Sequence, residues 1–207
     1  MSYLSRRARE KDMRAAGRLP DGQSLTEKFP VLTYGPTPAF EPASWDLRVF
    51  GAVEQPRRWT WREFTQLPRG ELTCDIHCVT RWSKFDTHWE GVFFRDFLRE
   101  LRLTSAAQYV IAHCEYGYTT NLPLAVMDDE DVMLAVKYEG RWLHEPDLIA
   151  HGGPLRTLVP KRYFWKSAKF LRALEFSPVD KPGFWEQGGY HNEGDPFQEQ
   201  RMRRRRW

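Results

Sequence analysis

Residues 74–83 read CDIHCVTRWS, the stretch of this 207-residue chain with the densest set of reactive side chains. A cysteine thiolate is a soft, strong ligand for transition metals. Arg81 would lower the pKa of the neighbouring Cys78 thiol and would attract an anion. Because buried cysteines are also common in ordinary cores, this segment alone leaves open both a metal site and simple packing.

A second reactive segment lies at residues 151–169 and reads HGGPLRTLVPKRYFWKSAK. Its glycines allow the backbone to approach a ligand closely. Five basic side chains, a serine hydroxyl and three aromatic rings within these nineteen positions suit a flat ligand that carries a phosphate. No P-loop or GxGxxG pattern is present, so a solvated basic loop remains the alternative.

Zinc is another metal that the sequence allows. Five side chains supply enough nitrogen and sulfur ligands for one zinc site, namely Cys74, His77, Cys78, His113 and Cys114. The spacing of the first two cysteines matches no common zinc motif, however, and the sequence lacks the C-x-x-C pattern of thioredoxin-type and c-type haem sites. Three cysteines, an odd number, argue against a disulfide framework and favour a reducing compartment.

The net charge of +3 conceals two basic ends. Residues 6–11 hold three arginines and a lysine, and residues 201–206 hold five arginines. Such runs are typical of solvated, disordered ends, so we expect the C-terminal run to be dispensable. Nucleic-acid binding by these ends is a less favoured alternative, because no nucleic-acid-binding motif lies between them.

The location of the protein is predicted from two patterns. No apolar run reaches the length of a membrane span. An export signal would need an apolar segment after Arg6-Arg7, and the residues that follow are polar and charged. We therefore expect a cytoplasmic protein without a membrane span.

The chain is expected to form one domain at residues 29–200, with a polar arm at 1–28 and a basic tail at 201–207. Strands outnumber helices and do not alternate with them, which favours a mixed α+β fold. The patterns predict strands at 45–49, 108–114, 155–159 and 170–176, a hairpin at 132–143 that turns at Glu139-Gly140, and helices at 60–67, after a capping box at Thr60, and at 93–101.

The two reactive segments, with three further strings, resemble the molybdopterin-binding domain of the sulfite oxidase family, in its small haem-free branch. The likeness runs from about Arg18 to Arg201, and five strings in order make it specific. These strings are RLPDGQSLTEKFPVLTYG (18–35), DIHCVTRWSKFDTHWEGV (75–92), GYTTNLPL (117–124), HGGPLRTLVPKRYFWKSAKF (151–170) and PGFWEQGGYHNEGDPF (182–197).

The resemblance implies an α+β fold in which mixed sheets and short helices surround a buried molybdenum–molybdopterin cofactor. It implies an oxidoreductase that transfers an oxygen atom to or from a small oxyanion or sulfoxide-type substrate. Cys78 matches the cysteine that binds molybdenum, and Arg81 and Tyr190 would act beside it on the substrate. The implied cofactor contacts are Tyr34, His113, His151, Arg156, Ser167, Ala168 and Lys169.

Two departures from the family pattern leave the substrate open. Sulfite oxidase itself has an arginine-rich sequence after its cysteine, whereas here Arg81 is the only arginine at a matching position. Thr80 stands where the methionine-sulfoxide reductase branch has an acidic residue. The expected partners are a small-molecule substrate and an unidentified electron donor or acceptor protein. A non-catalytic pterin- or nucleotide-binding module is the alternative to an enzyme.

Overall fold

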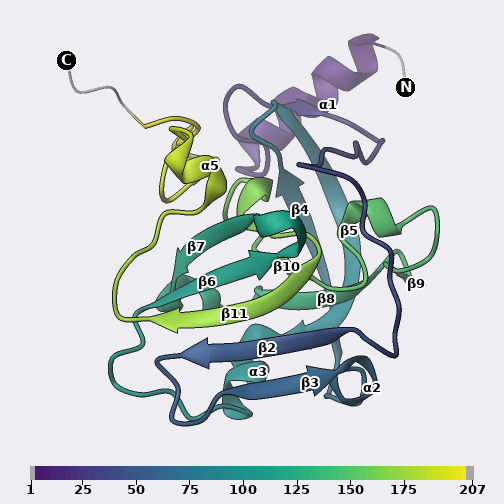
Figure 1. Cartoon of the computed structure of the whole chain (residues 1–207). Coiled ribbons are helices and arrows are strands. Elements are labelled where there is room, and N and C mark those ends of the chain that lie inside the picture. Colours follow the sequence, from purple (N-terminus) through teal and green to yellow (C-terminus); the bar gives the residue numbers. More distant parts are fainter. Residues whose placement is uncertain (1–2, 204–207) are drawn as a thin grey trace.

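The long hairpin of β4 and β5 is the centre of a six-stranded sheet. The computed structural model describes residues 3–203. β5 pairs with β4 and β8 in antiparallel fashion and with the short β1 in parallel, while β8 also pairs with β9 and β10. In Figure 1 the hairpin rises toward α1 (Tyr3–Ala15). The strands are β1 (Ser24–Leu25), β4 (Gly70–His77), β5 (Trp82–Phe93), β8 (Met133–Tyr138), β9 (Arg141–Trp142) and β10 (Arg156–Leu158).

A second sheet has five strands in the order β3-β2-β11-β6-β7. β2 and β11 are parallel, although more than a hundred residues separate them, and the other pairs are antiparallel. The mixed sheets confirm the predicted α+β class. The strands are β2 (Asp46–Gly51), β3 (Arg57–Thr60), β6 (Tyr109–Cys114), β7 (Thr119–Pro123) and β11 (Leu171–Ser177).

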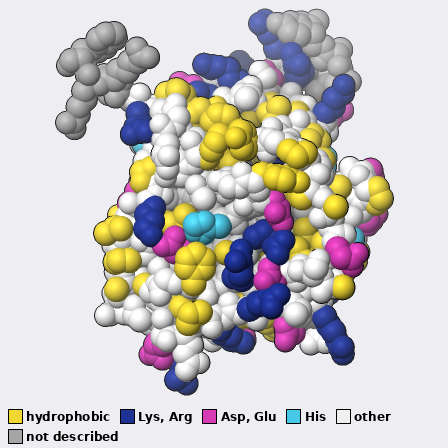
Figure 2. All heavy atoms as spheres, viewed as in Figure 1, with side chains coloured by type: hydrophobic (Ala, Val, Ile, Leu, Met, Phe, Trp, Pro, Cys, Tyr) yellow, Lys and Arg dark blue, Asp and Glu magenta, His cyan; other side chains and the backbone are white. Residues whose placement is uncertain are grey.

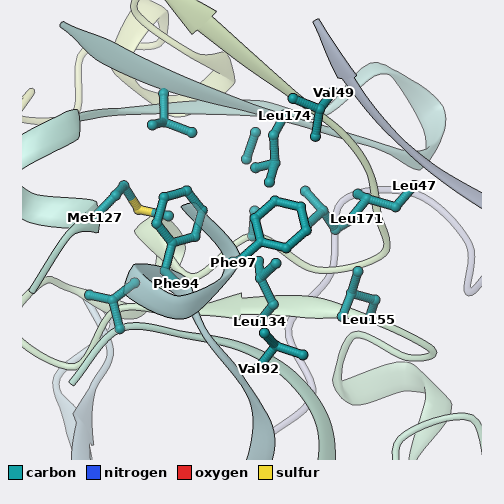
Figure 3. Close-up of a cluster of buried hydrophobic side chains, with 14 of the residues drawn as sticks. Leu47, Val49, Val92, Phe94, Phe97, Met127, Leu134, Leu155, Leu171 and Leu174 are labelled. Carbon is teal, nitrogen blue, oxygen red and sulfur yellow. The ribbon is translucent and has the colours of Figure 1, made fainter. Parts of the chain in front are cut away.

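The main core lies between the two sheets and is centred on α3 (Phe94–Arg99). Figure 3 shows Phe94 and Phe97 between Leu174 of the second sheet and Leu134 of the first. All four side chains are fully buried. Burial of each aromatic or leucine side chain contributes roughly 1.5–3 kcal/mol to the stability of the fold, so this contact stabilises the packing of the two sheets.

The remaining helices are single turns that join strands, except for α5, which follows the last strand. The Thr60 hydroxyl accepts a hydrogen bond from the Glu63 N–H, and the Glu63 carboxylate accepts one from the Thr60 N–H, so the predicted capping box is confirmed. The predicted helix at 60–67 is shorter than expected. These helices are α2 (Trp61–Phe64), α4 (Leu124–Met127), α5 (Phe184–Gln187), η1 (Glu115–Gly117), η2 (Ile149–His151) and η3 (Phe164–Lys166).

Both basic ends differ from the expected disordered tails. Residues 3–15 form α1, whose Glu10 carboxylate is buried and accepts a hydrogen bond from the Leu25 N–H at 2.9 Å. At the other end, the Arg201 side chain is largely buried and Met202 forms a β-bridge with Tyr190. Residues 204–207 of the expected tail lie outside the described residues. Among residues 3–203, no helix has both the length and the apolarity to cross a bilayer.

Candidate functional site

A cavity of about 350 Å³ opens where the ends of several elements meet. Its walls come from the loop before β2, the turn between β4 and β5, the turn between β6 and β7, and the segment from β10 to β11. The loop around α5 completes it. The lining side chains used below are Phe29, Tyr34, Cys78, Thr80, Trp82, Tyr118, Arg156, Trp165, Ser167, Lys169, Trp185 and Tyr190.

The turn between β4 and β5 presents Cys78 to this cavity. The Cys78 N–H donates to the Trp82 carbonyl at 2.9 Å, and the Arg81 N–H donates to the Cys78 carbonyl at 3.0 Å. Arg81 itself has a φ of 75°, which closes the turn. The Thr80 hydroxyl donates to the Cys78 sulfur at 3.1 Å. Burial raises the pKa of the Cys78 thiol, while the Thr80 hydrogen bonds and the charges of Arg201 and Lys169 act in the opposite direction.

The side chain of Arg81 is exposed and does not line the cavity. Its guanidinium lies beside Gly22, where a Cβ atom would come within 2.9 Å of Arg81 Nη1. The left-handed backbone at Arg81 closes the turn, and its side chain lies against Gly22 rather than on the cavity wall. The structure therefore does not bring Arg81 to the position expected for a group that acts on the substrate.

Arg156 and Lys169 place two cations on the cavity wall. The Arg156 guanidinium is fully buried and donates to the carbonyls of His151, Thr157 and Ser167, and the Lys169 ammonium donates to the Ala150 carbonyl at 2.7 Å. Burial lowers the pKa of Arg156 to about 9 and that of Lys169 to about 7, the latter with help from the Arg156 charge.

Within the described residues, neither of these cations forms a salt bridge with a carboxylate. Leaving a buried charge without an opposite charge is costly, because the carbonyl dipoles replace only part of its hydration. The neighbouring Ser167 also lines the cavity, and its hydroxyl accepts a hydrogen bond from the Val159 N–H at 2.9 Å. This corner of the cavity is therefore suited to an anion.

His151 and Ala168 lie behind the wall rather than on it. The His151 ring stacks on Phe29, with 4.1 Å between ring centroids, and Phe29 faces the cavity. Burial, then the charges of Lys169 and Arg156, lowers the pKa of His151 to about 4. Ala168 is buried, and its N–H donates to the Thr157 hydroxyl at 2.7 Å. Both residues shape the wall without contributing a side-chain surface to it.

Another part of the wall is aromatic and contains Tyr190. Its ring stacks on Trp185 at 5.0 Å between centroids and meets the edge of Trp165 at the same distance. Burial raises the pKa of Tyr190, and a negative charge on Cys78 adds to the rise, so the phenol stays protonated at neutral pH. At the mouth, the half-exposed Tyr34 ring packs on Phe184 at 4.2 Å. Tyr34 and Tyr190 thus lie on the same cavity as Cys78.

His113 lies elsewhere. Along β6 alternate residues face opposite sides of the sheet, so Ala112 and Cys114 point into the core and His113 points outward. Its Nε2 is 3.1 Å from a carboxylate oxygen of Glu175. His113 does not line the cavity, and its contact with Glu175 lies on the outer face of the sheet.

The zinc alternative lacks a donor set. Cys74 pairs with the Thr87 hydroxyl at 3.8 Å, Cys114 is buried in the main core, and the His77 Nδ1 is 2.8 Å from the Ser83 hydroxyl. In the part of the chain that the structure describes, no three His, Cys, Asp or Glu side chains are grouped to hold a metal. Of the three cysteines, only Cys78 faces the cavity.

Three residues that the sequence did not single out also support the site. Gln23 and Arg201 hydrogen-bond to the backbone of the Cys78 turn, and Glu186 accepts hydrogen bonds behind the aromatic wall. Gln23 and Glu186 belong to strings that resemble the family, but no spacing rule connects these three residues to Cys78. The contacts depend on tertiary structure alone.

Comparison with known proteins gives consistent results. The family model described as "Oxidoreductase molybdopterin binding domain" matches residues 34–185. The chain is 44% identical over 188 residues to "Uncharacterized oxidoreductase YuiH" of Bacillus subtilis, which covers 90% of this chain and 93% of that protein. It is 25% identical over 166 residues to the "Protein-methionine-sulfoxide reductase catalytic subunit MsrP" of Campylobacter jejuni, over 71% of this chain and 54% of that protein.

Among solved structures, the sulfane dehydrogenase SoxCD from Paracoccus pantotrophus is similar, with a TM-score of 0.63 and 19% identity. The match covers 74% of this chain and 42% of that one. At this identity the likeness establishes the fold, and it agrees with the two mixed sheets described above.

Proposed function

This chain belongs to the sulfite oxidase-like family of molybdopterin-binding oxidoreductases, and we propose that it transfers an oxygen atom from a sulfoxide-type substrate at a molybdenum ion held by Cys78. The observation that carries the proposal is that the Cys78 thiol opens onto the same cavity as the buried Arg156 and the partly buried Lys169. A soft thiolate suits the metal, and two cations suit the phosphate of the pterin.

The phosphate end of the cofactor fits the basic corner. Arg156 is buried and Lys169 is partly buried, both lack a carboxylate partner among residues 3–203, and a bound phosphate would pair with their charges. Gly152 lies behind this corner with a φ of 116°, and a Cβ atom there would meet the Lys169 side chain at 3.0 Å. We therefore assign Arg156, Ser167 and Lys169 to the phosphate.

The metal end of the cofactor fits the part of the cavity that Cys78 lines. Cys78 would bind molybdenum through its sulfur, and Thr80 would orient that sulfur through its hydrogen bond. The Trp82 indole N–H is buried, lacks a hydrogen-bond partner among the described residues and belongs to a side chain that lines the cavity. A polar ligand group beside Trp82 would satisfy it. When bound, the molybdenum–pterin supplies the two-electron chemistry of oxygen-atom transfer.

The substrate class is inferred from the aromatic part of the wall. Trp165, Trp185 and Tyr190 form an aromatic surface that suits a thioether or sulfoxide carrying apolar groups. The protonated Tyr190 hydroxyl would donate a hydrogen bond to the sulfoxide oxygen and orient it. Because Arg81 does not line the cavity, this aromatic part of the wall offers no cation to an inorganic oxyanion. The related reductase from Campylobacter jejuni is named for a sulfoxide substrate.

The overall reaction consumes two electrons and two protons. The sulfur–oxygen bond of the sulfoxide breaks, the sulfur is reduced to a thioether, and the oxygen leaves as water. An electron-donor protein must supply the electrons. Three unpaired cysteines support a reducing compartment, so we place the protein in the cytoplasm. Cell fractionation that recovers most of it outside the cytoplasm would overturn this location.

Nucleic-acid binding has less support. Figure 2 shows acidic side chains beside basic ones on the face seen in Figure 1, rather than a continuous basic surface. On the second sheet, for example, Asp46 pairs with both Arg58 and Arg172. A nucleic-acid-binding face would concentrate unpaired basic groups instead. A non-catalytic module is also less well supported, because Cys78 and Tyr190 both face the cavity.

The test is direct. The purified protein should contain molybdenum and a fluorescent pterin, and it should oxidise reduced viologen when methyl phenyl sulfoxide is added. Cys78→Ser should keep the fold and part of the pterin but lose activity, because a hydroxyl is a harder and less acidic ligand. Oxidation of sulfite by ferricyanide, without sulfoxide reduction, would reverse the proposed substrate class. Absence of both molybdenum and pterin from folded protein would reject the proposal.

A further inference from the structure

Two segments from opposite ends of the described chain hold the backbone of the Cys78 turn. The Gln23 side-chain amide donates to the Cys78 carbonyl at 3.0 Å. The Arg201 guanidinium donates to the Val79 carbonyl at 2.6 Å. Neither side chain lines the cavity or hydrogen-bonds to the Cys78 sulfur. Each therefore acts on Cys78 through the backbone.

The segment that carries Gln23 is itself anchored to the β4–β5 hairpin. Arg18 donates two hydrogen bonds to Asp75, at 2.7 and 2.9 Å, and a third to Asp86 at 2.6 Å. The Ser24 N–H donates to the Arg81 carbonyl at 3.0 Å, where β1 begins to pair with β5. Gln23 is only 1% exposed. Its amide is thus held at a fixed place relative to the turn.

Arg201 is fixed from the other side. Its guanidinium lies over the Tyr163 ring at 4.8 Å, and its side chain is 12% exposed. Its carbonyl accepts a hydrogen bond from the His191 N–H at 3.1 Å, which ties this segment to the loop after Tyr190. The same segment therefore connects the aromatic wall of the cavity to the Cys78 turn.

This polar cluster is expensive in free energy. Gln23 Oε1 and Arg201 Nε are buried and have no hydrogen-bond partner within residues 3–203, and Arg201 Nη2 has only a Glu199 carboxylate oxygen at 3.6 Å. Each such atom destabilises a fold by about 1–3 kcal/mol. Apolar side chains would fill the space more cheaply, but they would leave the Cys78 and Val79 carbonyls without these donors. Buried polar atoms without hydrogen-bond partners are expected mostly at functional sites.

We infer that Gln23 and Arg201 are positioning residues that fix the direction of the Cys78 sulfur toward the metal. The inference rests on the proposed function, since it takes Cys78 as the molybdenum ligand. Groups that orient a metal ligand typically change metal affinity or activity by roughly ten- to hundredfold when they are removed. Each carbonyl would move if its donor were lost, and the sulfur would turn with the backbone.

The experiment compares Arg201→Gln, Arg201→Lys and Gln23→Ala with the wild-type holoenzyme. Arg99→Gln is the matched control, because Arg99 is exposed on α3 and pairs with Asp96. The readouts are molybdenum and pterin per chain, the electron paramagnetic resonance signal of the half-reduced metal, thiolate-to-metal absorption, and kcat and KM for methyl phenyl sulfoxide. Thermal unfolding reports on the fold.

The two site variants, Arg201→Gln and Gln23→Ala, should keep their pterin but show a shifted resonance signal and absorption band. Their kcat should fall roughly tenfold or more at similar KM. Arg201→Lys, which keeps one charged donor, should recover part of the signal, and Arg99→Gln should match wild type. An unchanged spectrum in both site variants would overturn the inference and leave the proposed function intact. So would a lowered unfolding temperature with a wild-type spectrum, which means a structural role only. Wild-type protein without molybdenum would instead reject the proposed function itself.

Discussion

Lys166 and Glu186 form an ion pair of 2.7 Å in which the side chains are 0% and 1% exposed. The same Glu186 oxygen accepts hydrogen bonds from the Trp165 indole at 2.8 Å and the Thr120 hydroxyl at 3.0 Å. Lys166 also donates to the Asn121 carbonyl at 2.7 Å. The pair thereby joins η3, β7 and α5 behind the aromatic wall that carries Tyr190.

The first prediction concerns this pair. Lys166→Met should destabilise the protein by about 3–5 kcal/mol, because Glu186 would be left as a buried, unpaired charge. The double variant Lys166→Met with Glu186→Gln should recover much of that loss, since the amide is neutral and can still accept from Trp165. Urea unfolding of the single and double variants measures this coupling. Strictly additive losses would mean that the two charges do not depend on each other.

The second prediction separates the cofactor-loaded protein from the empty one. Lys169→Met should weaken pterin retention by roughly ten- to hundredfold, the equivalent of about 1.5–3 kcal/mol for a charge-assisted contact. In the cofactor-free chain the same change should be neutral or stabilising, because it removes a partly buried amine that has no carboxylate partner among the described residues. Pterin fluorescence after dialysis and unfolding of both forms are the measurements. Lys161→Met is the control, since Lys161 is exposed and pairs with Asp129.

Arg156→Ala is a less specific test of the same corner. Arg156 donates to three backbone carbonyls, so its loss should lower both pterin retention and stability. If Lys169→Met retained pterin like wild type, the phosphate would have to lie elsewhere.

The third prediction concerns the two cysteines outside the cavity. Cys74→Ser and Cys114→Ser should retain molybdenum, because neither sulfur faces the cavity. Burial raises the pKa of both thiols, to about 12 for Cys74, so both stay protonated and are poor ligands. Elemental analysis and thermal unfolding of each variant check this. Loss of bound zinc together with a lowered unfolding temperature in either variant would support the zinc alternative.

The fourth prediction concerns pH. His151 has a pKa of about 4 in the folded protein because of its burial and the nearby Lys169 and Arg156 charges, against 6.5 when exposed. Between pH 6.5 and 4 the unfolded chain takes up a proton that the folded protein does not, so stability falls as pH falls through this window. At about 1.4 kcal/mol per pKa unit, the loss reaches on the order of 3 kcal/mol.

His151→Gln isolates this contribution. The free energy of unfolding should fall less between pH 7.5 and 4.5 in this variant than in wild type. Burial also lowers the pKa of His77 to about 4, so part of the acid sensitivity should remain. Identical pH profiles for variant and wild type would contradict this prediction, because they would mean that His151 has the same pKa in the folded and the unfolded chain.

The sequence patterns predicted most strands of the second sheet but missed the central hairpin. In β5 the polar Ser83 and Thr87 are fully buried, whereas Phe85 is half-buried, so the hydrophobic alternation of a strand is obscured. The burial of Thr87 follows from its hydrogen bonds to the Cys74 carbonyl and the Trp89 indole. Such polar pairs depend on the partner strand and leave no periodic signal.

Short sequence motifs predicted most of the cavity-lining site residues, whereas contacts between residues far apart in the sequence could not be predicted. Cys78, Arg156, Ser167 and Lys169 lie in recognisable segments, and the structure places all four on one cavity. The resemblance to the family predicts Arg81 and His113 there as well. A left-handed turn residue and the two-residue period of a strand direct them elsewhere.

The hydrogen bond from Arg201 to the Cys78 turn can form only after nearly the whole described chain has been synthesised. Val79 and Arg201 are 122 residues apart, so the turn is made by the ribosome long before its second support. A nascent chain that ends anywhere before residue 201 leaves the Val79 carbonyl without that donor. A metal delivered to such a chain would meet an incompletely supported thiol. Cofactor loading is therefore expected to follow translation rather than to accompany it.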